Sequence, residues 1–305
     1  MAIKGVRLYC GIAETRWNYH PVQSGDYACV SPVKGRSDRT KATNRVSIPA
    51  AAAIIQDSGA FSDSWSTRLD FASALDRQIN HADRWHYTDQ ISHRATYDLL
   101  IDEVWDDGNR AKRRWTVGAA EDAVETTVAA ARYLDAHRDG LSLVVSAQGV
   151  DALQYLRCAE RLMSYMRDGD FFGFGGWCIL GKLPAQMMPI FRDTVATVIP
   201  FLAREGVRHV HIWGVIYPRG LGVLYRACVR HGLTLSTDSV GPSMLPIYGQ
   251  WGYGDWRDNT YARPPVETRG LERARHVRAT SSWLENFALT QYAIEPLVYS
   301  QASYL

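Results

Sequence analysis

Short apolar runs alternate with longer amphipathic stretches along most of the chain, and this alternation restricts the possible folds more than any other feature. In one amphipathic stretch, Ala120, Val124 and Val128 recur four positions apart and would form one apolar face of a helix. Repeated strand and helix patterns of this kind predict a parallel sheet whose strands are joined by crossover helices. The apolar runs are 97–101 (YDLLI), 141–145 (LSLVV), 171–174 (FFGF), 209–213 (HVHIW) and 233–236 (LTLS), and the amphipathic stretches are 119–137, 151–167, 189–205 and 221–231.

Three further runs near the N-terminus bring the predicted strands to the number that closes a barrel. These runs are 6–10, 27–30 and 53–56. Eight parallel strands with intervening helices make a TIM-like (β/α)8 barrel, and a chain of 305 residues has room for one. We therefore expect one α/β barrel domain over residues 1–305. An open doubly wound sheet is the main alternative, although no G-x-G-x-x-G pattern follows an early strand.

Two segments interrupt the alternation, and a third ends it. Residues 32–49 are polar and basic, and we expect them to form an insertion loop. Residues 241–265 are rich in glycine, proline and aromatic residues, which is typical of an ordered or gating segment rather than of a linker. The C-terminal part, 266–305, is predicted to be helical, with a helix over 266–290 that is broken near Gly270.

Charge and cysteine usage exclude several classes of protein. The formal net charge is only +2, so any contact with nucleic acid must come from local patches. The five cysteines are odd in number and have no C-x-x-C spacing, which argues against a disulfide framework and against a cysteine zinc site. The sequence therefore predicts a reducing, cytoplasmic location. No apolar stretch reaches 18 residues and the N-terminus does not read as a signal peptide, so we expect no membrane partner.

Acidic residues follow three of the predicted strands. In parallel barrels the functional groups gather at the C-terminal ends of the strands, and Asp57, Asp102 and Asp238 stand at such ends. A single Asp there is unremarkable, because Asp is a favoured helix N-cap. Three carboxylates beside glycine-rich segments favour a ligand site instead. The other strand ends supply Ser58, Gln148, Gly175, Gly176, Trp177 and Gly214.

The segments at these strand ends resemble motifs of the guanine transglycosylase family, in the same order along the chain. The resemblance covers residues 50–245; each motif is short, but six in order form a specific signal. DSGAF at 57–61 is similar to the family's DSGGF or DSGGY, and DEVWDDG at 102–108 is similar to its Asp-Glu segment. AQGVDALQYLR at 147–157 is similar to its Q-G-G loop and helix, and FGFGGWCILG at 172–181 is similar to its G-G-L-x-x-G. WGV at 213–215 is similar to its M-G-V, and TDSVGPS at 237–243 is similar to its D-C-V-x-P-T.

The resemblance implies a role for each carboxylate. Asp238 would be the nucleophile that attacks the sugar C1′ and displaces guanine, as in retaining glycosidases. Asp57 would be the general acid and base, protonating the departing base and deprotonating the incoming one. Asp102 and Gln148 would hydrogen-bond the polar edge of the purine, because a carboxylate accepts from N–H groups and an amide donates to a carbonyl.

The remaining motif residues are assigned to substrate binding by the same resemblance. The backbone of Gly175 and Gly176 would donate to the base, and Phe61 and Trp213 would stack on its two faces. Both aromatic residues also fit a purely structural role in the core, and Gln148 also fits a cap of the helix that starts near residue 151. Ser58, Trp177 and Gly214 belong to the same motifs and are counted as substrate-binding.

Two departures from the family pattern concern the nucleic acid. The transfer-RNA enzymes carry a C-x-C-x-x-C and His zinc module, whereas this chain has no cysteine after Cys228, so we predict no zinc and no cofactor. The arginines that read the RNA loop are also absent from the positions that follow Ser243. The chain therefore looks more like the DNA-guanine transglycosylases of bacteriophages and bacterial DNA-modification clusters. DNA becomes the expected partner, with transfer RNA as the alternative.

The incoming base is expected to be a 7-deazaguanine. The bacterial transfer-RNA enzymes have a Glu after the G-G-L-x-x-G run, near the aminomethyl group of their cationic substrate. This chain has Lys182 there, and a lysine repels an ammonium group. We therefore favour a neutral substituent, such as the nitrile of 7-cyano-7-deazaguanine (preQ0).

Three basic stretches are candidates for phosphate contacts: a first basic loop, a cluster before Trp115, and residues 263–278. Charge runs are often only solvated faces, so this assignment competes with a plain surface role. His81, His86 and His93 lack the carboxylate spacing of a metal site, and we predict none. The phosphate candidates are Arg36, Lys41 and Arg45 in the first basic loop, and Lys112, Arg113 and Arg114 before Trp115.

Other activities remain open on the same residues. A barrel nucleosidase or glycoside hydrolase would use Asp57 and Asp238 with water, and a binding protein would keep the pocket without turnover. No feature of the sequence predicts an oligomeric state.

Overall fold

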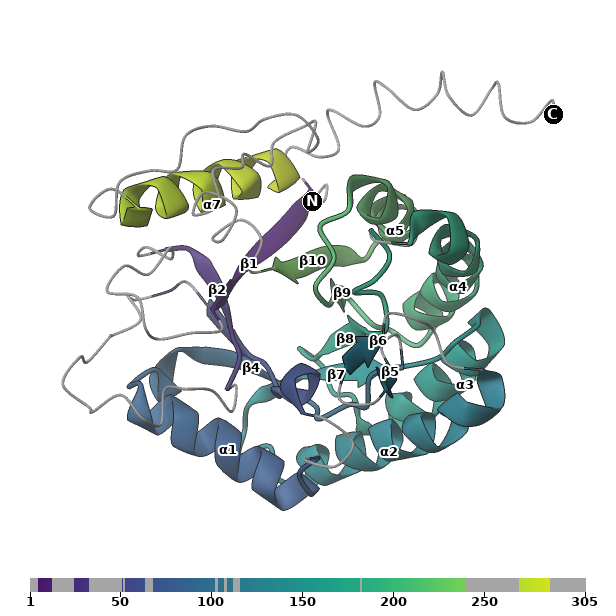
Figure 1. Cartoon of the computed structure of the whole chain (residues 1–305), viewed down its shortest axis with the longest axis horizontal. Coiled ribbons are helices and arrows are strands. Elements are labelled where there is room, and N and C mark those ends of the chain that lie inside the picture. Colours follow the sequence, from purple (N-terminus) through teal and green to yellow (C-terminus); the bar gives the residue numbers. More distant parts are fainter. Residues whose placement is uncertain are drawn as a thin grey trace.

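Eight parallel strands close into a barrel, with helices on its outside (Figure 1). The computed structural model describes residues 5–12, 25–32, 51, 53–63, 68–101, 104–106, 109–111, 116–181, 183–239 and 269–285. Around the barrel the strands follow the order β1-β10-β9-β8-β7-β4-β3-β2, and every neighbouring pair is parallel. The fold is therefore a TIM barrel, as the alternation predicts, and the open doubly wound sheet is excluded.

The barrel strands are short, and most are followed by a longer helix. The barrel contains β1 (Val6–Ile12), β2 (Tyr27–Val30), β3 (Ala53–Gln56), β4 (Ile91–Ala95), β7 (Ser142–Ala147), β8 (Phe171–Phe174), β9 (His209–Ile212) and β10 (Thr234–Ser239), and β5 (Val104–Asp106) pairs with β6 (Asn109–Ala111) as a separate antiparallel ribbon. The helices are α1 (Phe71–Arg84), α2 (Val117–Ala136), α3 (Ala152–Leu162), α4 (Pro184–Arg204), α5 (Pro218–Arg230) and α7 (Arg269–Glu285), with 3-10 turns η2 (Ala60–Ser62), η3 (Thr88–Gln90) and η4 (Met163–Tyr165).

Local sequence explains where several helices begin. The side chain of Asp70 accepts a hydrogen bond from the backbone N–H of Ser73 at 2.7 Å and caps α1. Asp151 caps α3 in the same way, accepting from Gln154 N–H at 2.8 Å. Helices α4 and α5 each begin with a proline, whose missing N–H costs nothing in the first turn. Helix α1 is an addition to the predicted helices.

The fourth barrel strand is β4 (Ile91–Ala95), so the predicted strand at 97–101 is wrong. The segment ISHRA reads as polar, yet its polar groups have partners inside the fold. Arg94 Nε donates to Gln56 Oε1 at 2.9 Å, and Ser92 Oγ donates to the carbonyl of Ile54 at 3.0 Å. The apolar run that follows leaves the sheet, and its Leu99 and Ile101 are buried beside α2 with Ala120, Ala123 and Val150.

The C-terminal helix α7 packs beside β1 and Gly5 (Figure 1). It runs from Arg269 to Glu285, which confirms a helix in this part of the chain; it begins one residue before Gly270, and the predicted helical residues 266–268 and 286–290 lie outside the described residues. Val277 and Leu284 are buried in the core, and a Cβ added to Gly5 would lie 2.1 Å from the carbonyl oxygen of Glu285. This close approach explains why glycine stands at position 5.

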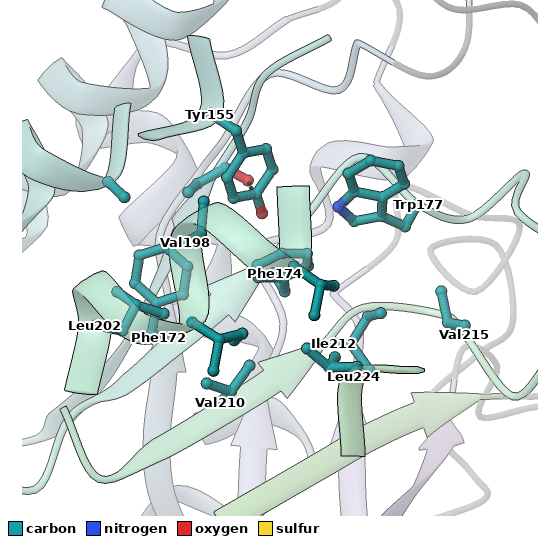
Figure 2. Packing of buried hydrophobic residues seen from close by; sticks show 14 of the residues in the cluster. Tyr155, Phe172, Phe174, Trp177, Val198, Leu202, Val210, Ile212, Val215 and Leu224 are labelled. Atoms are coloured by element: carbon teal, nitrogen blue, oxygen red, sulfur yellow. Dashed lines mark hydrogen bonds between the residues drawn. The ribbon is translucent and has the colours of Figure 1, made fainter. Parts of the chain in front are cut away.

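The main hydrophobic core lies between the strands and the outer helices (Figure 2). Phe172 and Phe174 on β8 and Val210 and Ile212 on β9 are fully buried there, and each such side chain contributes about 1.5–3 kcal/mol on burial. The alternate residues of the strands point into the barrel, where Tyr9, Cys29, Ile55, Ala95 and Val144 form a smaller cluster. Among the described residues, no helix is long and apolar enough to span a membrane.

Candidate functional site

Three carboxylates gather at the C-terminal ends of β3, β4 and β10. Asp57 directly follows β3, Asp98 comes three residues after β4, and Asp238 is near the end of β10. The negative charge of Asp238 contributes to raising the pKa of Asp57, and the charge of Asp57 contributes to raising the pKa of Asp98. The three groups therefore share one region of the barrel mouth, where each repels its neighbour.

Asp98, which the strand pattern did not single out, lies after β4 at the barrel mouth, and the role assigned to Asp102 stays a prediction. Because β4 ends at Ala95, the loop that leaves the barrel carries Asp98 into the site, whereas Asp102 lies outside the described residues. Hydropathy does not indicate that Asp98 belongs to the site, since Asp98 stands inside the apolar run YDLLI. The only available hint was that a carboxylate seldom interrupts an apolar run without a partner or a purpose.

Asp57 is held in place by hydrogen bonds to both of its carboxylate oxygens. Ser31 Oγ donates to Oδ2 at 2.6 Å, and the backbone N–H of Ser58 donates to Oδ1 at 2.7 Å. Gly59 follows with a φ of 76°, a conformation that favours glycine and turns the chain into η2. Burial raises the pKa of Asp57, and the charge of Asp238 adds to this, while the Ser31 hydrogen bond opposes it.

Asp238 is held through one carboxylate oxygen. The backbone N–H of Gly214 donates to Oδ1 at 2.8 Å, and His211 Nε2 lies 3.3 Å from the same oxygen. The side chain is 17% exposed, so it is reachable from solvent although it is anchored. Among the described residues, Oδ2 carries no hydrogen bond, which leaves it available for chemistry.

Asp98 and Gln148 form a buried pair beside the glycines of β8. Gln148 Nε2 donates to Asp98 Oδ2 at 2.5 Å, and burial is the main cause that raises the pKa of Asp98 to about 6. Gln148 Oε1 is buried and has no partner among the described residues. A Cβ at Gly175 would lie 2.4 Å from Gln148 Nε2, so this amide needs glycine there. Gly176 follows with a φ of 79°.

Trp213 is fixed at the end of β9. Its Nε1–H donates to Ser146 Oγ at 2.9 Å, and its ring meets the His211 ring edge to face at 4.4 Å. A Cβ at Gly173 would lie 2.8 Å from the indole nitrogen, so this glycine makes room for the ring. Phe61 lies on η2 and is 40% exposed. Phe61 follows β3 and Trp213 follows β9, and their stacking on one base stays a prediction.

Three of the expected substrate residues have other contacts in the structure. Trp177 is fully buried in the main core, where it stacks on Phe174 with ring centroids 6.1 Å apart, so it is a core residue rather than a site residue (Figure 2). Gly214 holds Asp238 through its N–H, and Ser58 holds Asp57 in the same manner. Both therefore orient the carboxylates directly.

Most of the predicted phosphate contacts fall outside the described residues, while Arg275 and Arg278 of the 263–278 stretch are exposed on α7. This applies to Arg36, Lys41, Arg45, Lys112, Arg113 and Arg114, to most of the 32–49 loop, to 241–265 and to Lys182. No group of three or more potential metal ligands occurs within the described part of the chain. His81 contacts Tyr87 Oη at 2.8 Å, and His93 stacks on Phe171 inside the barrel.

Comparisons with known proteins support the fold. No family model and no curated protein matches the sequence. One similar solved structure is a protein from Coccidioides immitis described as a "putative fructose-1,6-biphosphate aldolase", with 9% sequence identity and a TM-score of 0.50. The alignment covers 95% of this chain and 94% of that one, so the similarity extends over the whole barrel. At this level of identity the similarity shows a shared fold, and the activity of the other protein cannot be assigned to this chain from it.

Proposed function

We propose that the protein is an enzyme that exchanges guanine in DNA for a 7-deazaguanine base. The observation that carries the proposal is the pair of Asp57 and Asp238, two interacting carboxylates in unlike environments at one barrel mouth. Pairs of titratable groups whose surroundings differ in this way are typical of sites with an acid and a nucleophile. The order of the sequence motifs adds the choice of a guanine transglycosylase.

In the first half of the reaction, Oδ2 of Asp238 attacks C1′ of the nucleotide. The C1′–N9 bond breaks, and guanine leaves with the bonding electron pair while protonated Asp57 supplies a proton to the base. The result is a covalent ester between Asp238 and the sugar. The ester carbonyl at Oδ1 keeps the hydrogen bond from the Gly214 N–H, so the anchor that holds the carboxylate also holds the intermediate.

In the second half, the incoming 7-deazaguanine gives up a proton to Asp57 and forms the new bond to C1′. The ester bond breaks and Asp238 returns to a carboxylate, so the proton and the electron pair are both restored. A raised pKa suits Asp57 for this work, because the carboxyl group then exchanges a proton more readily near neutral pH. The reaction consumes no other reagent.

The base is recognised by Asp98 and Gln148, with the backbone of Gly175 and Gly176 beside them. Asp98 Oδ2 is used by Gln148, which leaves Oδ1 to accept from the N1–H or the amine of a guanine-like base. Gln148 Oε1 has no partner in the described structure, and an unsatisfied buried group of this kind is typical of a ligand site. As an acceptor it would take an N–H of the base, whereas Nε2, the donor expected to face the base carbonyl, is bonded to Asp98. Trp213 supplies a ring for stacking.

Replacing Asp98 with Asn tests this assignment. We expect Asp98→Asn to weaken binding of the 7-deazaguanine about 10- to 100-fold at neutral pH, since a charge-assisted hydrogen bond contributes roughly 1.5–3 kcal/mol. In the wild type the affinity should fall as the pH drops through about 6, because the carboxylate that accepts the base N–H becomes protonated. Calorimetric titrations at several pH values measure both effects. An affinity that is unchanged in the variant, with the same pH profile, would remove Asp98 from the base site.

The choice of DNA and of a nitrile base rests on the sequence. The missing zinc module and RNA-reading arginines favour DNA, and Lys182 favours preQ0 over the aminomethyl base. Incubating the protein with labelled guanine and either duplex DNA or transfer RNA separates the two substrates. We expect labelled guanine to be incorporated into DNA and added preQ0 to release that label. Incorporation only into RNA would contradict the choice of DNA.

The same assay separates exchange from the other activities. A nucleosidase or glycoside hydrolase would release free base without incorporating another. A binding protein would retain DNA without any turnover. Tighter calorimetric binding of the aminomethyl base than of preQ0 would overturn the choice of incoming base.

A further inference from the structure

Two neighbouring side chains of α1 hold the backbone of the turn that carries Asp57. Gln78 Nε2 donates to the carbonyl of Asp57 at 3.1 Å. Arg77 Nη2 donates to the carbonyl of Ser58, the next residue, at 2.6 Å. A Cβ at Gly59 would lie 2.8 Å from Arg77 Nη2, so glycine at this position makes room for the guanidinium group. Two consecutive carbonyls of the turn are therefore held by two consecutive residues of one helix.

Gln78 also connects this turn to the neighbouring strand. Its Nε2 donates to the carbonyl of Ala95, the last residue of β4, at 3.1 Å. An amide nitrogen has two hydrogens, so both are used, one at the end of β3 and one at the end of β4. The side chain is buried. A single amide thus links the two strand ends from which the chain continues to Asp57 and to Asp98.

Arg77 makes a second connection between the same two loops. Its Nη1 donates to both carboxylate oxygens of Asp63, at 3.0 and 3.1 Å. The Asp63 carboxylate also accepts a hydrogen bond from Tyr97 Oη, and Tyr97 directly precedes Asp98. Asp63 is almost fully buried, so its charge depends on these partners. The guanidinium group therefore ties Ser58, through Asp63, to the loop that carries Asp98.

We propose that Arg77 and Gln78 are positioning residues that fix Asp57 relative to Asp98. Neither side chain is assigned a contact with the substrate. They act because the base held by Asp98 must exchange its proton with Asp57, and a small displacement of either group slows such a transfer. Their catalytic meaning rests on the proposed function, whereas the bracing of the turn is a property of the fold.

Arg138 offers a matched control because it forms the same arrangement at the other end of the barrel. Its Nη1 donates to both carboxylate oxygens of Asp170 at 3.0 Å, and its Nη2 donates to the carbonyl of Tyr165 at 2.9 Å. Arg138 precedes β7 and Asp170 precedes β8, so this pair lies at the N-terminal ends of the strands. Arg138 also pairs with Asp135, so Arg138→Lys should cost the fold at least as much stability as Arg77→Lys.

Hydrogen exchange of the Ser58 amide in the full chain tests the bracing without any substrate. This N–H donates to Asp57 Oδ1, so its exchange rate reports how firmly the turn is held. At a temperature where every variant is folded, we expect exchange about tenfold faster or more in Arg77→Lys and in Gln78→Leu. A single ammonium cannot replace both Nη groups, and leucine donates no hydrogen bond. Arg138→Lys should leave this rate unchanged.

Base-exchange kinetics of the same variants test the catalytic meaning. Arg77→Lys and Gln78→Leu should lower kcat roughly 10- to 100-fold and change KM for the base less than about twofold, because Asp98 still binds it. Arg138→Lys should keep the wild-type kcat. A Ser58 amide as protected in both variants as in the wild type would overturn the proposal, as would a normal kcat in a variant with a loosened turn or an equal loss in Arg138→Lys. A wild type that exchanges no base contradicts the proposed function alone, and the Ser58 amide still decides the bracing.

Discussion

Asp238→Asn should reduce base exchange by about 10⁴-fold or more, the largest effect expected of any single substitution in this protein. The amide lacks the negative charge and the free electron pair that form the ester with C1′, so no covalent intermediate can arise. Asparagine has nearly the same shape, and its oxygen can still accept from the Gly214 N–H, so the fold should persist. The loss would therefore report the chemistry and not the stability.

Two measurements check this result. Exchange is followed by the incorporation of labelled guanine into DNA, and the intermediate is followed on a denaturing gel as a protein–DNA complex formed without added base. The wild type should give both signals and the variant neither. Asp193→Asn, which changes an exposed carboxylate on α4, is the matched control and should retain full activity. Exchange at a normal rate in Asp238→Asn would exclude Asp238 as the nucleophile.

Asp57→Asn should lower the exchange rate about 10²- to 10⁴-fold, which is the usual contribution of a general acid and base. Asparagine cannot give a proton to the departing guanine or take one from the incoming base. Because Asp238 remains, the covalent complex should still form, but slowly. This outcome differs from that of Asp238→Asn, in which the complex is absent.

The pH dependence gives the Asp57 assignment a second test. Burial and the charge of Asp238 raise the pKa of Asp57, so the carboxyl keeps its proton to a higher pH than an ordinary Asp does. The rate of guanine departure in the wild type should fall as the pH rises through this raised pKa, because the acid is then lost. Single-turnover rates across pH show this decline, and it should vanish in Asp57→Asn. A decline that persists in the variant would assign the proton transfer to another group.

Three of the four polar side chains of this site could be predicted from the sequence, and Asp98 could not. Asp57, Gln148 and Asp238 each follow a strand that was predicted from its apolar run, and the structure places them at the barrel mouth. Asp98 was missed because the strand before it is polar. Its sequence, ISHRA, becomes a strand through the contacts of Arg94 with Gln56 and of His93 with Phe171, which are remote in the sequence. A pattern read along one segment contains no information on such partners.

The alternation of apolar runs and amphipathic stretches by itself determined a parallel sheet covered by helices and favoured a barrel over an open sheet, since a parallel strand followed by a helix has few ways to bury both apolar faces. Tertiary structure alone decided that Asp98 lies in the site after β4, that Trp177 belongs to the core, and that His211 contacts Asp238. The physical reason is that burial and hydrogen-bond direction depend on groups from several strands at once.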